Sequence, residues 1–466
     1  MTAARHSGLR LVRDAAAFRR VFSLAGPIIL ANLTQPLLST VDAAIAGHMP
    51  AESALGGVAL GGVVFNVVFW AFGFLRMGTT GLVAQAEGAR EPAAMRTSLV
   101  QALLLAAMLG AALLALQAPL IAGALRLLGG SDSVRASAAA YAGARIWSAP
   151  ATLANYAMLG YLLGRQRAGS ALALQVLINL ANVVLAVILV YGLGWSVGGL
   201  GAATAAADWV GLAAGLALVT RLQSRGLPPL TWTELLATAP LGRLVAVNRD
   251  IFLRTLCLMA AFAWFAHEGA ALGDAVLAAN AVLMNFMTVT AFALDGFAQA
   301  AEALVGDAVG RRDRIEFRRW VGVALLWSVA GAALFSLALA VCGAALVAAL
   351  TDQPAIREAA MACLTWAAAA PLISVWCYLL DGVFIGATKT RELRNGAALS
   401  LVVFLGAAAM LRPPLGNQGL WAALMLFQVA RAAVLAVWLG RIDRALRPAP
   451  ATPSPESRPA TICCAN

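Results

Sequence analysis

The sequence predicts an all-α integral membrane protein: twelve transmembrane helices in two six-helix bundles related by a pseudo-twofold axis along the membrane normal. Three observations support this prediction. Of the 466 residues, 61% are hydrophobic and only 12% are charged, and the mean hydropathy is +0.82, which is far more apolar than a soluble protein. Apolar windows of about 20 residues, the length that crosses a bilayer, recur along the whole chain. The second half of the chain also repeats the pattern of the first.

The windows are taken in chain order. Those of the first half cover residues 23–46, 57–80, 98–122, 139–163, 171–192 and 198–220. Those of the second half cover residues 251–267, 276–301, 320–350, 358–386, 396–411 and 417–440.

The repeat appears when each residue is compared with the one about 222 positions later, as Tyr156 and Gly160 align with Tyr378 and Gly382. Because six is an even number, both halves enter the membrane in the same direction, which places the symmetry axis along the membrane normal. The expected organisation is a cytoplasmic N-terminal segment (1–22), an N-terminal lobe (23–222), a cytoplasmic linker (223–249), a C-terminal lobe (250–441) and a disordered cytoplasmic tail (442–466).

The basic residues indicate topology. The 33 Lys and Arg against 22 Asp and Glu give a formal charge of +11, but most of them lie in the N-terminal segment, in alternate loops and in the tail. The intervening loops hold only Arg126, Arg135, Arg357 and Arg412. This distribution follows the positive-inside rule and predicts that both termini are cytoplasmic. The expected partner is therefore the lipid bilayer, and no nucleic acid.

The first apolar window contains a carboxylate, Asp42, and two prolines, Pro27 and Pro36. An ionisable residue within a span costs about 3 kcal/mol to insert, so it normally faces the protein interior and marks an ion or proton path. Each proline removes a helical hydrogen bond, which predicts two bending points. We interpret Asp42 as a proton carrier whose protonation bends this helix. The residue 222 positions later is Trp264, so this acid belongs to the first half alone.

Further polar side chains in the apolar windows of the first half are candidates to line a substrate cavity together with Asp42. Gln35 shares a helical face with Asp42, and Asn179 shares one with Asn182. Asn179 and Asn182 could instead serve only to pack helices. Further candidates are Asn155, Tyr156, Thr204 and Asp208, the last of which could also lie near a helix end.

The second half has acids of its own in apolar windows: Asp295, Glu302 and Asp381. Asp295 and Asp381 each precede a glycine, where a local backbone hydrogen bond is the alternative to an ion site. The sequence contains no H-E-x-x-H, no G-x-S-x-G and no His or Cys cluster in a cytoplasmic loop. We therefore expect no enzyme, no metal site and no cofactor.

Several long stretches resemble the multidrug and toxic compound extrusion (MATE) transporters, and within them the DinF-like (DNA-damage-inducible protein F) branch. They are SLAGPIILANLTQPLLSTVDAAIAGH (23–48), FWAFGFLRMGTTGLVAQAEGA (69–89), NRDIFLRTLC (248–257), LAANAVLMNF (277–286), ALDGFAQAAEALVGDAVGRRD (293–313) and VWCYLLDGVFIGATKTRE (375–392). The resemblance implies twelve spans in two lobes and efflux of lipophilic, often cationic, compounds driven by an ion gradient.

In DinF-like transporters a first-span aspartate is the proposed proton carrier and a first-span proline takes part in helix bending, roles that fall on Asp42 and Pro27. The family's fifth-span motif has an asparagine followed four residues later by an aspartate, whereas Asn182 is followed here by Ala186. The seventh-span acid of sodium-coupled relatives also has no counterpart in AAFAWFA (260–266), which favours protons over sodium.

Two alternatives stay open, a sodium-coupled exporter and a flippase for lipid-linked precursors of the same superfamily. A flippase needs several basic residues in its cavity to hold a diphosphate. The predicted spans contain only Arg76, Arg145, Arg254 and Arg431, all but the last near span ends. The composition, rich in Ala and with Arg far more common than Lys, fits a GC-rich bacterial genome, so we expect a multi-pass protein of a bacterial inner membrane that works as a monomer.

Overall fold

The computed structural model describes residues 14–223, 231 and 237–446, and within them all regular structure is helical. The helices of the first half follow one another with short connections. They are α2 (Ala15–Gly47), α3 (Ser53–Ala71), α4 (Phe74–Gly88), α5 (Pro92–Ala115), α6 (Gln117–Leu128), α7 (Asp132–Arg145), the 3-10 turn η1 (Ile146–Ser148), α8 (Ala149–Gly164), α9 (Ala168–Val187), the π turn η2 (Ile188–Gly192) and α10 (Val197–Leu222).

The helices of the second half are fewer and longer. They are α12 (Thr238–Ala270), α13 (Asp274–Gly310), α14 (Arg314–Leu350), α15 (Pro354–Gly386), α16 (Thr390–Leu415) and α17 (Asn417–Ala445). The last part of the segment expected as a linker is thus the beginning of α12. The expected tail from residue 447 onward lies outside the described residues, and residues 442–445 belong to α17.

Ten helical segments of the described chain are long and apolar enough to cross a membrane. The protein is therefore a multi-pass membrane protein, and each predicted window falls on helix, though not always on one helix. Window 57–80 is divided between α3 and α4 by a turn at Phe72 and Gly73, and window 139–163 between α7 and α8 by η1. Apolar composition predicts burial in lipid but does not show these local breaks.

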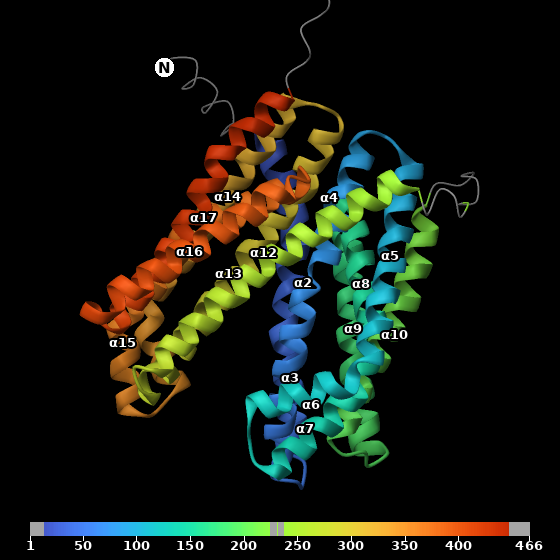
Figure 1. Cartoon of the computed structure of the whole chain (residues 1–466). Helices are drawn as coiled ribbons and strands as arrows, with labels where there is room; N and C mark the ends of the chain where they lie inside the picture. Colours follow the sequence, from blue (N-terminus) through green and yellow to red (C-terminus); the bar gives the residue numbers. More distant parts are fainter. Residues whose placement is uncertain (1–13, 224–230, 232–236, 447–466) are drawn as a thin grey trace, which may run out of the picture.

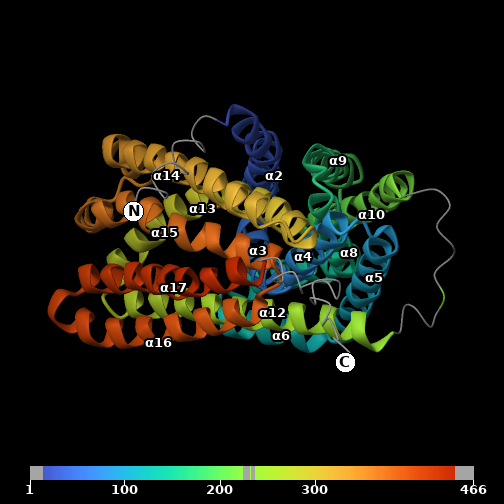
Figure 2. The same ribbon diagram turned by 90° about the horizontal axis from the view of Figure 1, so that it is seen from above.

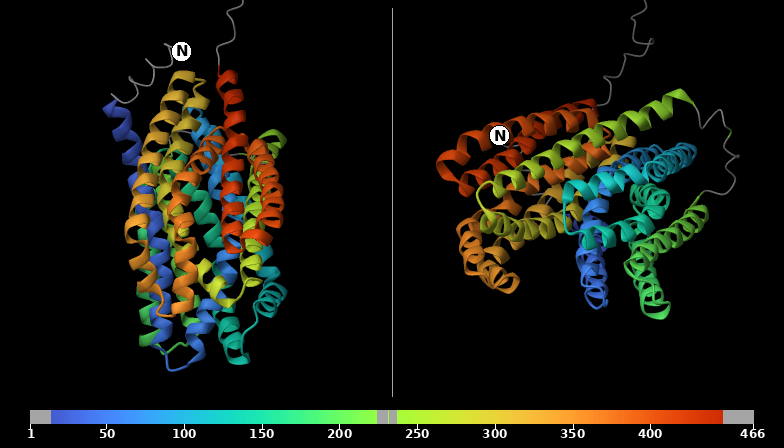
Figure 3. Two further views of the ribbon diagram at one scale, coloured as in Figure 1. Left: turned by 90° about the vertical axis from the view of Figure 1, so that its left-hand side faces the viewer. Right: turned by 60° about the horizontal axis from the view of Figure 1, so that its bottom comes forward.

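The helices of the two halves occupy opposite sides of the molecule (Figure 1). Seen from above, α13 to α17 lie mainly on one side and α5 and α8 to α10 on the other, while α12 crosses toward the first half and contacts α4 (Figure 2). Most of the long helices run roughly parallel to one another (Figure 3). The halves meet chiefly where α13 packs on α2 and α4, with further contacts from α14 to α2 and from α15 to α4.

The tightest contacts between the halves lie at the ends of α4 and α13. A Cβ at Gly88 would collide with the backbone oxygen of Asp307, and a Cβ at Gly310 with the backbone oxygen of Gln85. Only a glycine permits such a close approach of two helices. We name this region the terminal joint, because it lies at the same end of the molecule as the start of α2 and the end of α17 (Figure 1).

Candidate functional site

Asp42 lies on α2 with only 7% of its surface exposed, and its Oδ1 is buried without a hydrogen-bond partner among the described residues. The guanidinium of Arg145, at the end of α7, is the positive charge that acts on this carboxylate. Arg145 donates a hydrogen bond of 2.6 Å to the hydroxyl of Tyr141, one helical turn earlier. The buried carboxylate thus lies within the electrostatic field of a cation at the end of α7.

The same group extends to α9 and α10. Tyr141 lies close to Thr204, and Asn182 donates a hydrogen bond of 2.8 Å from Nδ2 to Thr204 Oγ1. Asn182 Oδ1 is buried and has no partner in the described structure. Asp42, Tyr141, Arg145, Asn182 and Thr204 therefore form one polar cluster, which we call the first-half cluster. Its residues lie on α2, α7, α9 and α10, so a change in charge at one side chain alters the interactions of four helices.

Asp208, Asn155 and Thr152 form a second polar group, between α8 and α10. Thr152 Oγ1 donates to Asp208 Oδ2 at 2.5 Å, and Asn155 Nδ2 donates to the backbone oxygen of Asp208 at 2.9 Å. Asp208 lies in the middle of α10, so the alternative that it marks a helix end is wrong. Tyr156 is half-buried on α8, and the charges of Asp208 and Arg145 both act on it.

The remaining first-half candidates are less closely connected to Asp42. Asn179 accepts a hydrogen bond of 3.1 Å from Gln175 on its own helix. Pro27 is half-buried within α2, which is assigned as one continuous helix from Ala15 to Gly47. The side chains of Gln35 and Pro36 lie outside the described part of the structure.

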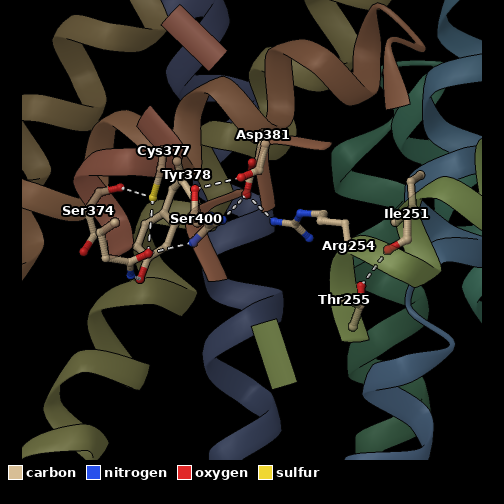
Figure 4. Close-up of polar contacts among 11 residues, drawn as sticks. Ile251, Arg254, Thr255, Ser374, Cys377, Tyr378, Asp381 and Ser400 are labelled. Atoms are coloured by element: carbon tan, nitrogen blue, oxygen red, sulfur yellow. Dashed lines mark hydrogen bonds and ion pairs between the residues drawn. The ribbon is translucent and has the colours of Figure 1, made fainter. Parts of the chain in front are cut away.

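In the second half, Asp381 is 6% exposed and accepts hydrogen bonds at Oδ2 from two buried arginines, Arg254 of α12 and Arg431 of α17. The bond from Arg431 is 2.5 Å long. Arg431 also donates to Gln428 Oε1 at 2.7 Å. In Figure 4, Asp381 lies between Arg254 on one side and Tyr378 and Cys377 on the other. Asp381 is thus part of a buried ion cluster with two arginines, rather than a side chain that only bonds to the local backbone.

Arg254 corrects one prediction. The sequence predicts Arg254 near the end of a span that begins at residue 251. In the structure α12 begins at Thr238, so Arg254 lies at the middle of this helix. It is 8% exposed. Its burial is possible because Asp381 neutralises part of its charge.

Glu302 and Asp295 lie on α13, which joins the two halves. Glu302 is 1% exposed and lies close to Thr80 of α4, and its Oε1 has no hydrogen-bond partner within the described residues. Asp295 is partly exposed, and the charges of Arg76 and Arg254 act on it. The acids of the second half thus lie near arginines from α4, α12 and α17.

Sequence reasoning missed Tyr141 and Arg145 as partners of Asp42, and Arg254 and Arg431 as partners of Asp381. The available signal was the presence of arginines within or beside apolar windows, because a buried charge normally requires a partner. Among residues 14–223, 231 and 237–446, no three His, Cys, Asp or Glu side chains come together as metal ligands.

Long apolar helices in two groups, with buried charged side chains in each, are typical of a membrane transporter. The MatE family model matches residues 27–188 and 251–407, which is more than half of the chain. The chain belongs to the MatE family and is a transport protein, not an enzyme.

Two curated relatives and one solved structure illustrate this membership. DNA damage-inducible protein F of Escherichia coli (strain K12) is 43% identical over 425 residues, 90% of this chain and 92% of the relative. The "Probable multidrug resistance protein NorM" of Acinetobacter baylyi is 26% identical over 432 residues, 91% of this chain and 92% of the relative. A MOP superfamily transporter from Pyrococcus furiosus superposes with a TM-score of 0.84 at 19% identity, over 95% of this chain and 99% of that one, which shows a shared fold.

Proposed function

We propose that this protein is a secondary active multidrug exporter that moves small lipophilic or cationic compounds out of the cell in exchange for protons. Its twelve spans form two six-helix lobes that alternate access to a site between them. It resides in a bacterial inner membrane with both termini cytoplasmic, and it acts as a monomer. Family membership and relatives named as multidrug resistance proteins support the transport class.

The observation that carries proton coupling is the state of Asp42. A carboxylate with one buried oxygen that lacks a hydrogen-bond partner can gain or lose a proton without first breaking a hydrogen bond at that oxygen. The positive charge of Arg145 acts on this carboxylate, so loss and gain of the Asp42 proton switch the first-half cluster between a net charge of zero and a net positive charge. This change alters the affinity of the site for a charged substrate, as antiport requires.

The coupling of charge to shape follows from the position of Asp42 on α2. In our proposal, protonation of Asp42 weakens its attraction to Arg145 of α7 and allows α2 to bend at Pro27 and Pro36. Movement of one proton through a potential of 100 mV supplies about 2.3 kcal/mol, which corresponds to a gradient of roughly fiftyfold for a neutral substrate; export of a monovalent cation in exchange for one proton moves no net charge and is driven by the pH gradient.

Two rivals are weighed by specific residues. A sodium-coupled exporter needs an acid on α12 near residues 260–266, and that stretch contains none. A flippase needs cationic side chains free to bind a diphosphate. Four arginines do lie in or beside the predicted spans, but Arg254 and Arg431 are both bonded to Asp381. Protons and drug-like substrates therefore remain our proposal.

The test is proton release when tetraphenylphosphonium is added to weakly buffered, purified protein. We expect wild type to release protons independently of sodium and Asp42→Asn to release none. Asp132→Asn is a matched control, because Asp132 is exposed and its ion pair among the described residues is with Arg135 on its own helix. Proton release by Asp42→Asn at the wild-type level would move the coupling site to Asp295, Glu302 or Asp381.

A further inference from the structure

A cavity of about 320 Å³ lies beside the terminal joint and is distinct from the Asp42 and Asp381 clusters. It is lined almost entirely by charged and polar side chains. Its arginines are Arg20, Arg165, Arg167 and Arg311. Four guanidinium groups around one cavity repel one another unless acids or a bound anion compensate their charge.

The acids of the cavity compensate only two of these arginines. Arg165 Nε lies 3.1 Å from Glu87 Oε2, and Arg311 Nε lies 3.0 Å from Asp307 Oδ2. With two acids against four arginines, the lining keeps a formal charge of +2. The cavity therefore has the electrostatics of an anion site.

Arg20 and Arg167 carry the uncompensated charge. Arg20 donates a hydrogen bond of 2.6 Å to the neutral amide oxygen of Gln166. Arg167 is exposed and follows Gln166 in the connection between α8 and α9. Arginine presents a planar fork of donors that matches two oxygens of a phosphate. These two side chains are thus suited to receive a phosphate group.

The position on the opposite side of the joint is built differently. Gln85 is the repeat equivalent of Asp307, which lies 222 residues later. Thr388 is the repeat equivalent of Gln166, which lies 222 residues earlier. There Arg243 donates directly to Gln85 Oε1 at 2.6 Å and to Thr388 Oγ1 at 3.2 Å. On this side of the joint the hydrogen bonds of Gln85 connect the two halves directly, whereas on the other side Arg20 is bonded to Gln166 within the first half and a positively charged cavity lies between the halves.

We propose that this cavity binds a phosphate-bearing anion that bridges the two halves. α2, α4 and the α8–α9 connection supply one wall and α13 supplies the other, so a bound phosphate holds both halves together. Basic cavities between helices at the cytoplasmic face commonly take phospholipid headgroups. The placement of this face in the cytoplasm rests on the proposed function, but binding itself does not depend on transport.

The anion also acts as a regulator. Alternating access requires the halves to separate at the terminal joint when the site opens toward that side. An anion that contacts both walls binds the closed joint better than the open one, so it favours the closed arrangement, and by linkage the closed arrangement favours the anion.

Binding is measured on the purified full chain in detergent by thermal shift and calorimetry, with three probes: inorganic phosphate, a short-chain phosphatidylglycerol and the matching phosphatidylcholine. We expect phosphatidylglycerol to bind. If inorganic phosphate binds as well, the site recognises the phosphate alone, and if it does not, the site needs a lipid. Either result supports the proposal when the double variant Arg20→Gln/Arg167→Gln weakens the binding by about tenfold or more.

The matched control is Arg19→Gln, which removes the same charge from the adjacent, exposed residue of α2. This variant should leave affinity within about twofold of wild type. Arg20→Lys/Arg167→Lys keeps the charge but not the fork and should fall between wild type and the Gln variant. The proposal is overturned if none of the three probes binds, if phosphatidylcholine binds as tightly as phosphatidylglycerol, or if Arg19→Gln weakens binding as much as the double variant. Proton release with tetraphenylphosphonium separates this outcome from a failure of the exporter proposal.

Discussion

The ion cluster at Asp381 gives the sharpest prediction of stability. Replacement of Asp381 by Asn keeps the size of the side chain but leaves Arg254 and Arg431, which are 8% and 4% exposed, without a counterion at this position. Breaking a buried ion pair on one side costs about 3 to 5 kcal/mol. Because two arginines lose the same partner, we expect the upper part of this range. The apparent melting temperature should fall by roughly 5 °C or more.

The assay is thermal unfolding in detergent, followed by the fluorescence of the 12 tryptophans, with all variants heated at one rate. The control is Asp352→Asn, because Asp352 is fully exposed and its partner Arg357 lies 2.9 Å away; this variant should cost about 1 kcal/mol or less. Addition of Arg254→Gln to Asp381→Asn should recover part of the lost stability, since it removes one uncompensated charge. Equal melting temperatures for the Asp381 and Asp352 variants would refute the reasoning.

Two further predictions concern the ends of the helices. Gly88→Val should cost about 1 to 3 kcal/mol, because its Cβ would meet the backbone oxygen of Asp307; thermal unfolding and proton release both test this, and wild-type values in both would contradict the packing. Asp14 accepts a hydrogen bond from the backbone N–H of Ala17, which, with Arg319 nearby, lowers the pKa of its carboxyl from 3.8. The resulting stabilisation of the start of α2 is present above pH 3.8 and is lost as pH falls through the lower folded value. Hydrogen exchange of the first turn of α2 should show this acid-dependent loss in wild type and not in Asp14→Ala.

Much of the fold could be predicted because its physical cause is local. A long run of apolar residues is excluded from water whatever the rest of the fold, so α13, α14 and α17 coincide with windows predicted from hydropathy. The breaks at Phe72 and at η1 could not be predicted in this way, since a short interruption between two apolar helices barely changes the composition of a window. The early start of α12 was missed because Arg243, Arg249 and Asp250 interrupt the apolar residues of its first turns, and a hydropathy window does not detect a helix that extends beyond its apolar part.

The candidate site was predicted in part, and the difference lies in sequence distance. Asp42, Asn182 and Thr204 were identified one by one from their residue type, and Asn182 and Thr204 are hydrogen-bonded to each other. The role of Arg145 depends on where the end of α7 lies relative to Asp42 in the fold, which no pattern within either segment encodes. The same is true of Arg431, which reaches Asp381 from another helix. Residue type indicates that a buried charge needs a partner, and only the fold identifies that partner.

The reciprocal contacts of the terminal joint have a consequence for how the protein can change over time. Gly88 contacts Asp307, and Gly310 contacts Gln85. Gly88 and Gly310 are repeat equivalents, as are Gln85 and Asp307, so the two contacts are the same contact made twice with the halves exchanged. This is the pattern of an isologous interface between two copies of one subunit, here within a single chain. An ancestral half-length chain that paired with itself would have satisfied both contacts with one glycine. After duplication, both Gly88 and Gly310 must remain glycine for the two helices to approach this closely. A side chain at either position would separate the halves even if the other glycine were kept.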